Sequence, residues 1–186
     1  MRYFASYESP YGNMLVVAST EALVGLYFVG QKYFPRHDPE WREDADAAPI
    51  AQTIRELDEY FGGERTRFDV PLAPHGTSFQ RAVWKGIASV PYGETITYGE
   101  LARRAGVPGN ARAAGAATGQ NPIGVIVPCH RIVGANGSLT GYAGGLDKKR
   151  ALLALEAEHA AHDLLRPAST SARKARSPSD SRGRQI

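Results

Sequence analysis

Three short runs of apolar and aromatic residues open the chain, separated by polar turn-forming segments. The runs cover residues 3–8, 14–19 and 23–29 and are rich in Val, Leu, Tyr and Phe. Such runs, bounded by Ser, Pro and Gly, predict a meander of three β-strands. Residues 31–48 are polar and carry many acidic side chains, so a loop is predicted there.

An amphipathic helix is predicted after this loop. Apolar residues recur there at every third or fourth position: Ile50, Ile54, Leu57 and Phe61. Pro49 is typical of a helix start, and Gly62 and Gly63 are typical of a helix end. Three strands and one helix make a small α/β domain over residues 1–76, because a Pro- and Gly-containing segment follows it and such segments often separate domains.

The second half of the chain predicts several helices that begin at polar caps. The spacing of a capping box occurs twice: Thr77 with Gln80 and Thr97 with Glu100. The helix that starts after Thr97 is short, and Asn110 can cap a further helix over residues 111–118. A Gly-containing turn joins these two helices, which is the pattern of a helix-turn-helix.

The predicted helix 111–118 consists almost entirely of Ala and Gly, with Arg112 as its one long side chain. Small residues allow a helix backbone to approach another surface closely. That surface is either the rest of the domain or a nucleic-acid groove into which Arg112 reaches. The pattern leaves both open, because any helical hairpin can imitate a helix-turn-helix.

Cys129 is the only cysteine of the chain and follows the apolar run 123–127 and Pro128. A β-branched run that stops at a proline predicts a buried strand, which would hold Cys129 at the rim of a core. The neighbouring His130 could favour the reactive thiolate form. A lone cysteine is otherwise most often a small buried hydrophobe.

Asp147 is predicted to cap a last helix, whose apolar residues are Leu152, Leu153 and Leu155. This helix completes a mostly helical domain over residues 77–160. Residues 161–186 are rich in Ser, Arg and Pro and predict a basic, disordered tail.

Charge is unevenly distributed along the 186 residues. The net charge is −5 over residues 1–76, +4 over 77–160 and +4 over 161–186. This asymmetry favours a polyanionic partner for the second half, although charged surfaces also serve solubility. The sequence has neither a membrane-spanning apolar run nor a secretory signal, and a single cysteine forms no internal disulfide, so we expect a cytoplasmic protein.

The second half resembles the O6-alkylguanine-DNA alkyltransferases, also called methylated-DNA–protein-cysteine methyltransferases. Segments that match the family follow one another in its order: residues 91–95, 97–102, 111–113, 121–122, 126–131 and 141–146. Residues 1–76 resemble the variable N-terminal domain of the family only in general character. The resemblance implies an RNase H-like α/β domain with a small antiparallel sheet and a helix, followed by a mostly helical domain with a helix-turn-helix.

The resemblance also implies a reaction. Cys129 would accept the alkyl group of O6-alkylguanine, and less well of O4-alkylthymine, in a single irreversible turnover. His130, oriented by Glu156, would act as the base through a water molecule. Asn121 would brace the turn before the active-site segment. No cofactor is implied, and no zinc is expected, because the first domain lacks cysteine and His37 and His75 are too few ligands.

The partner implied is double-stranded DNA with an alkylated guanine, bound by a monomer that needs no protein partner and no membrane. Arg112 would fill the gap left by the flipped base, and Tyr98 would contact the phosphate backbone and donate to the guanine ring. The guanine pocket would be completed by the main-chain carbonyls of Cys129 and Ile132 and by the loop residues Tyr142, Ala143 and Gly144.

Two other functions remain open at this point. A DNA-binding sensor could recognise alkylated bases without reacting, but relatives of that kind replace the acceptor cysteine. A Cys–His hydrolase would use Cys129 and His130, but would leave the small-residue helix with Arg112 unexplained.

Overall fold

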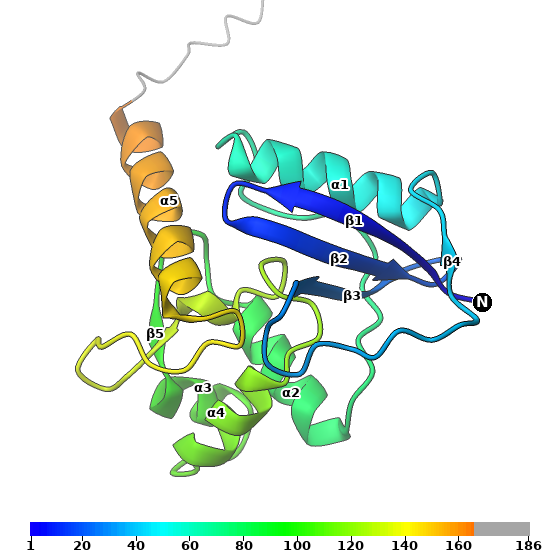
Figure 1. Ribbon diagram of the computed structural model, residues 1–186. Coiled ribbons are helices and arrows are strands. Elements are labelled where there is room, and N and C mark those ends of the chain that lie inside the picture. The colour runs from blue at the N-terminus through cyan, green and yellow to red at the C-terminus, as the bar shows by residue number, and fades with distance from the viewer. Residues whose placement is uncertain (166–186) are drawn as a thin grey trace, which may run out of the picture.

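The computed structural model describes residues 1–165 as two packed halves, shown in Figure 1. The first half contains the strands β1 (Tyr3–Ser9), β2 (Gly12–Ala18), β3 (Leu23–Phe28) and β4 (Arg42–Glu43) and the helix α1 (Ala48–Phe61). The second contains the helices α2 (Ser78–Ala88), α3 (Tyr98–Arg104), α4 (Ala111–Gly119) and α5 (Leu146–Leu165), the 3-10 turn η1 (Cys129–Arg131), and the strands β5 (Ile96–Thr97) and β6 (Ile132–Val133).

The predicted meander is confirmed and forms a sheet of order β3-β2-β1-β4. Strands β1 and β2 are antiparallel, with Ser9 opposite Gly12 across a tight hairpin, and β3 adds antiparallel to β2. Gly12 has a φ of 120°, a backbone conformation that glycine adopts without strain. The loop predicted over residues 31–48 is wrong at one place, because Arg42 and Glu43 pair parallel with β1 as β4.

Helix α1 lies across one face of this sheet (Figure 1). Its most buried large side chains are Ile50, Leu57 and Tyr60, each with no exposed surface. The helix ends where predicted, because Gly63 has a φ of 77° and follows its last turn. Tyr60 was not among the apolar residues from which this helix was predicted.

The helix starts of the second half are largely confirmed. Thr77 and Gln80 form both hydrogen bonds of a capping box, and the Asn110 side chain accepts from the Ala113 N–H at 3.3 Å. The second predicted capping box is half wrong. Thr97 does cap α3, but the Glu100 side chain bonds to arginines of its own helix instead of returning to the cap.

The strand predicted over residues 123–127 is wrong. Ile123 makes one bridge to Leu26 of β3, after which the backbone turns, and Val125 has a φ of 67°. Ile123, Val125 and Val127 are nevertheless at most 3% exposed. The apolar run therefore reflects burial at the junction of the two halves rather than a strand.

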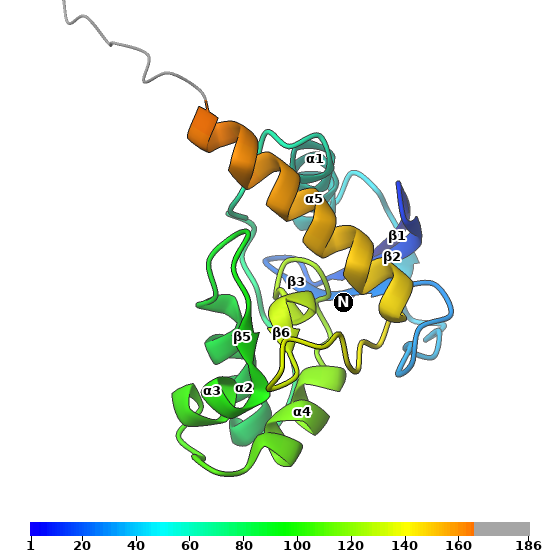
Figure 2. The same cartoon turned by 90° about the vertical axis from the view of Figure 1, so that its left-hand side faces the viewer.

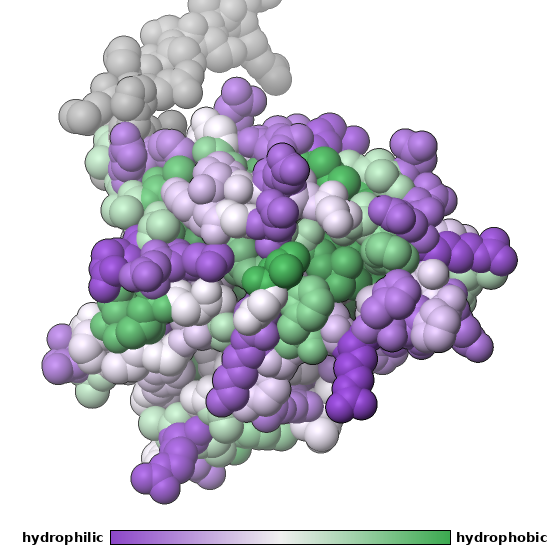
Figure 3. Space-filling model, viewed as in Figure 1, coloured by the Kyte–Doolittle hydropathy of each residue, from purple (hydrophilic) through white to green (hydrophobic). Residues whose placement is uncertain are grey.

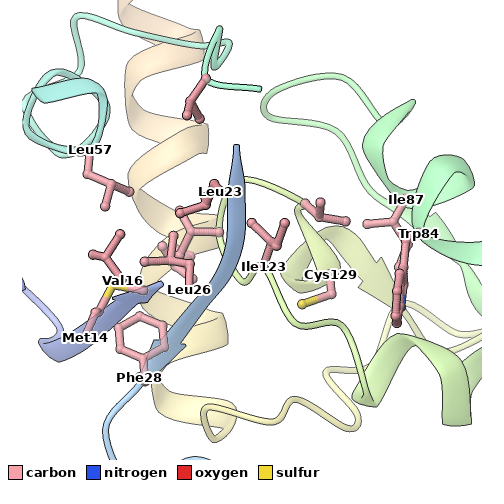
Figure 4. Close-up of a cluster of buried hydrophobic side chains, with 14 of the residues drawn as sticks. Met14, Val16, Leu23, Leu26, Phe28, Leu57, Trp84, Ile87, Ile123 and Cys129 are labelled. Carbon is pink, nitrogen blue, oxygen red and sulfur yellow. The ribbon is translucent and has the colours of Figure 1, made fainter. Parts of the chain in front are cut away.

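This junction is held by the outer edge of β3. The Leu26 N–H donates to the Pro122 carbonyl at 2.8 Å, and the Gly124 N–H donates to the Leu26 carbonyl at 2.9 Å. Figure 4 shows the result: the side chains of the sheet continue through Ile123 to Cys129 and Trp84 without a break between the halves. Cys129 thus lies at the end of a core to which both halves contribute.

Helix α5 connects the two halves, running across the face turned to the viewer in Figure 2. Near its start Lys148 lies beside Gly12, and near its end His159 packs on Gly63, so close that a side chain there would overlap the imidazole. The helix begins at Leu146, one residue before the predicted cap Asp147, which instead pairs with Arg150. It extends to Leu165, five residues into the predicted tail, and the rest of that tail lies outside the described residues.

The surface carries hydrophilic side chains around its outline, with apolar residues gathered near the middle of the face in Figure 3. No helix within residues 1–165 is long and apolar enough to cross a membrane.

Candidate active site

Cys129 begins the turn η1 and is only 6% exposed. Its Sγ accepts a hydrogen bond from Nδ2 of Asn121 at 3.3 Å. Burial raises the pKa of the Cys129 thiol, while the Asn121 amide and the nearby charge of Lys149 act in the opposite direction. The resting protein therefore holds a protonated thiol beside groups that stabilise its anion.

Asn121 fastens the end of α4 to the segment that carries the cysteine. Its Nδ2 also donates to the Val127 carbonyl at 2.8 Å, and its Oδ1 accepts from the Ile123 N–H at 3.1 Å. The side chain is 5% exposed. The amide thus fixes the irregular backbone before Cys129 in place of the regular hydrogen bonds that a strand would have supplied.

His130 is fully buried, and its Nε2 lies 2.8 Å from Oε1 of Glu156. Burial lowers the pKa of the imidazole, and the hydrogen bond to the Glu156 carboxylate partly opposes this. Burial also acts to raise the pKa of Glu156. The hydrogen bonds from His130 and Arg131 outweigh this effect and hold the pKa of the carboxyl well below its usual range. Glu156 is therefore ionised, which assigns the proton of neutral His130 to Nε2.

This assignment leaves Nδ1 of His130 as a free acceptor. Among the side chains that the structure describes, those of residues 1–161, Nδ1 is the one buried nitrogen or oxygen that has no hydrogen-bond partner. A buried acceptor without a partner is costly and usually has a specific explanation, such as a role in proton transfer or a bound water.

Sequence reasoning missed most of the groups that hold Glu156. Besides His130, the carboxylate accepts from the Arg131 guanidinium at 2.9 Å on both oxygens, from the Tyr60 hydroxyl at 2.7 Å and from the Gly93 N–H at 3.1 Å. Arg131 stands in the same motif as Cys129, a signal that could have identified it. No local signal marks Tyr60, which comes from the other half of the chain.

Lys149 was also missed. It is fully buried, and its Nζ donates to the carbonyls of Ile132 at 2.5 Å and Thr140 at 2.8 Å. Burial lowers the pKa of the ammonium to about 8, and the nearby Cys129 acts against this shift. Ile132 itself is buried, and its carbonyl, predicted to face the guanine amine, already accepts from Lys149. In the sequence, Lys149 looks like any charged residue in the first turns of a helix.

The loop predicted to wall the pocket is held from both halves. The Tyr98 hydroxyl lies 3.1 Å from the Thr140 carbonyl and 3.2 Å from the Gly141 carbonyl. The Ala143 carbonyl accepts from the N–H of Lys32, in the loop after β3, at 3.1 Å. These contacts set the position of the loop.

The end of the same loop packs between two aromatic rings. A Cβ on Gly144 would lie 2.8 Å from the Tyr142 ring and 3.0 Å from the Phe28 ring. Only glycine fits at residue 144 without displacing one of these rings.

Helix α4 combines the two alternatives that its composition left open. On one face Ala114 and Ala117 are buried, and the Ala117 carbonyl accepts from the Trp84 indole at 2.9 Å. On the other face Arg112 and Ala116 are exposed one turn apart. Small residues therefore serve packing on one side and leave a smooth outer face, from which only Arg112 projects.

The structure brings Cys129, His130, Glu156, Asn121 and Ile132 into one buried cluster, with Tyr98 and the loop residues 142–144 beside it. Arg112 lies apart from this cluster on the exposed face of α4. In the part of the chain whose side chains are described, residues 1–161, no group of three or more Cys, His, Asp or Glu side chains is placed to hold a metal ion.

Two family models together match most of the chain. Residues 2–74 match the ribonuclease-like domain of 6-O-methylguanine DNA methyltransferase, and residues 78–158 match its DNA binding domain. The chain belongs to the 6-O-methylguanine DNA methyltransferase family. Family membership applies to both halves, including the first, where the sequence motifs were few.

Individual relatives agree with this assignment. The chain is 46% identical over 164 residues to the methylated-DNA–protein-cysteine methyltransferase of Mycobacterium tuberculosis, covering 88% of this chain and 98% of the relative. It is 47% identical over 154 residues to the protein of that name from Methanosarcina acetivorans, covering 83% and 97%.

Solved structures show the same fold. The crystal structure of M. tuberculosis O6-methylguanine methyltransferase superposes with a TM-score of 0.79 at 45% identity, covering 86% of this chain and 94% of that one. The crystal structure of M. tuberculosis OGT in complex with DNA also has a TM-score of 0.79, at 44% identity, covering 84% and 94%.

Proposed function

We propose that this protein repairs DNA by transferring the alkyl group of O6-alkylguanine directly and irreversibly to Cys129, as a methylated-DNA–protein-cysteine methyltransferase. The observation that carries this proposal is the buried row of Cys129, His130 and Glu156, in which Nδ1 of His130 is left without a partner. The family and the DNA-bound relative supply the substrate class.

Activation of the thiol begins with proton removal. A water between Cys129 and Nδ1 of His130 would pass the thiol proton to the imidazole, since Nδ1 is the free acceptor. Ionised Glu156 stabilises the resulting imidazolium through Nε2. Asn121 and Lys149 stabilise the thiolate, which is the reactive form.

The thiolate then attacks the alkyl carbon in a displacement. A sulfur–carbon bond forms, the bond between that carbon and O6 breaks, and the electron pair stays with the guanine. The Tyr98 hydroxyl, now turned to the carbonyls of Thr140 and Gly141, would donate to the guanine ring as negative charge develops. The thioether has no carbonyl for water to attack, so one protein molecule removes one alkyl group.

The target atom lies inside the duplex, so the base must be flipped out at a cost of a few kcal/mol. We assign α3 and α4 to a helix-turn-helix whose second helix lies in the minor groove, because its exposed face offers only small side chains and Arg112. Arg112 would occupy the gap in the base stack. The pocket would consist of the loop residues 142–144 and the carbonyls of Cys129 and Ile132.

Finer features belong to the same proposal. The first domain, over residues 1–76, would have an RNase H-like fold, and the DNA-binding domain would cover residues 77–160. The protein would act as a monomer, accept O4-alkylthymine less well, and work in the cytoplasm, where a reactive thiol stays reduced. The basic residues of the predicted tail lie outside the described part of the chain.

Intact mass spectrometry with peptide mapping tests the reaction, after incubation with a duplex that contains one O6-methylguanine. We expect one added methyl group on Cys129, saturating at one per protein, and none in Cys129→Ala, which should still bind the duplex. Tight binding by the wild-type protein without a mass change would identify a sensor instead. Hydrolysis of an activated ester beyond one equivalent would identify a hydrolase.

A further inference from the structure

Tyr60, in the first half of the protein, contacts Glu156, one of the three residues of the proposed Cys129–His130–Glu156 site. It lies in the last turn of α1, is fully buried, and donates from its hydroxyl to Oε1 of Glu156 at 2.7 Å. The same oxygen lies 2.8 Å from Nε2 of His130. Figures 1 and 2 both place α1 close to α5, the helix that carries Glu156.

Packing alone explains the ring of Tyr60 but not its hydroxyl. The ring lies 5.2 Å from the ring of Phe61, 5.3 Å from that of Phe68 and 5.9 Å from that of Tyr92, between centroids. Phenylalanine would make these contacts equally well. A hydroxyl buried at such a site is costly unless it is hydrogen-bonded, and here its acceptor is the catalytic carboxylate.

We propose that Tyr60 is a positioning residue of the alkyl transfer, which holds the Glu156 carboxylate and limits how strongly that carboxylate attracts the proton of His130. The proposal rests on the function proposed above. It gives the first half of the chain a role in the reaction, although none of the residues proposed to contact the substrate belongs to that half.

The direction of the effect follows from the number of donors on Oε1. This oxygen accepts from Tyr60, His130 and the Arg131 guanidinium. Without the phenol hydroxyl, its charge is shared between two donors, so it attracts the His130 proton more strongly and favours the imidazolium. Burial raises the pKa of Tyr60 well above its usual value, so the hydroxyl remains a donor throughout the working pH range.

The other charged and titratable groups around this pair come from several elements, and the Tyr60→Phe change replaces none of them. They are Cys129 and Arg131 of η1, Lys149 of α5, Tyr92 before β5 and Tyr142 in the loop before α5. Arg131 and Lys149 lower the pKa of His130. A change in His130 titration on losing one hydroxyl would therefore report on Tyr60 itself.

The test compares Tyr60→Phe with Tyr7→Phe. Tyr7, on β1, donates to Oδ1 of Asp58 in α1 at 2.9 Å, so its variant also loses a tyrosine–carboxylate bond between α1 and its surroundings, but away from the site. Two quantities are measured: the single-turnover rate of methyl uptake from an O6-methylguanine duplex across pH, and the His130 imidazole titration by NMR in the protein without DNA.

In Tyr60→Phe we expect both the His130 titration and the acid limb of the rate profile to move upward by about one pH unit. In Tyr7→Phe we expect neither to move, although thermal stability falls. Unchanged curves in Tyr60→Phe would overturn the proposal, as would an equal shift in both variants. If the wild-type protein takes up no methyl group, the proposed function fails, while the NMR titration still decides whether Tyr60 controls His130.

Discussion

Two glutamates of this protein, one inside the molecule and one on its surface, each pair with two basic side chains. Glu156 has a fully buried side chain, whereas the side chain of Glu100 on α3 is 30% exposed. The pKa of both carboxyls is lowered. For Glu156 the hydrogen bonds act against burial, and for Glu100 the bonds from Arg103 and Arg104 lower it to about 2.

A lowered pKa has different consequences in the two places. In water an ion pair gains little, because solvent screens the charges and long side chains lose freedom. Inside the protein, removing the charge from water costs free energy. Each hydrogen bond that offsets this cost is therefore needed for the stability of the folded protein. The number of partners of Glu156 from separate segments indicates a site built around its charge, while Glu100 bonds only within its own helix.

Replacing the buried carboxylate should have the largest effect. Glu156→Gln leaves Arg131 without a charge partner, so the free energy of unfolding should fall by about 3–5 kcal/mol, and methyl uptake should be lost. Denaturant unfolding followed by tryptophan fluorescence measures the first, and mass spectrometry the second. Glu158→Gln, an exposed change two residues further along α5, is the control and should alter neither.

Acid should destabilise the protein through the same site. The folded-state pKa values of His130 and Glu156 are both lowered, so the unfolded chain binds more protons than the folded one as the pH falls below their usual values. Stability should therefore decrease first below about pH 6.5 and again below about pH 4.5. Below about pH 4.5 the unfolding free energy should fall less steeply in Glu156→Gln, which lacks the carboxylate that titrates there; parallel curves in that range would contradict the explanation.

Arg112 carries an exposed charge, and we expect it to affect the repair of duplex DNA but not the stability of the protein. None of the ion pairs among residues 1–161 involves Arg112. Arg112→Ala should leave the unfolding midpoint unchanged but slow repair of duplex DNA by about tenfold or more, since flipping costs a few kcal/mol. Reaction with free O6-benzylguanine base is the control and should hardly change. Equal slowing of both reactions would remove Arg112 from base flipping.

The smallest effect is expected for Glu100. Glu100→Gln removes its bonds to Arg103 and Arg104, but water and salt already weaken them. The thermal midpoint and the uptake rate should match those of the wild-type protein at physiological salt. A clear loss of stability would mean that surface pairing on α3 matters more than its exposure indicates.

Local features were predictable from the sequence where local physics decides them. The capping box of Thr77 and Gln80 satisfies helix N–H groups within four residues, so it needs no distant partner. The prediction failed for residues 123–127, where an apolar run looked like a strand. Those residues are buried because β3 and both halves surround them, and burial alone does not determine backbone conformation.

The site was predictable to the same extent. Cys129 and its neighbour His130 were candidates from their own motif, whereas Asn121 and Glu156 came only from the family resemblance. Tyr60 and Lys149 had no signal, because a buried tyrosine on a helix and a lysine near a helix start are both common. Only their acceptors, the Glu156 carboxylate and the carbonyls of Ile132 and Thr140, distinguish them.

The sequence by itself determined the helix caps at Thr77 and Asn110, the hairpin strands and the candidate nucleophile Cys129, since these depend on neighbours within a few residues. The tertiary structure alone decided the ionised state of Glu156, the free nitrogen of His130 and the contribution of Tyr60. These depend on burial and on hydrogen bonds between residues far apart along the chain, such as Tyr60 and Glu156. Such contacts exist only after the two halves have packed around one core.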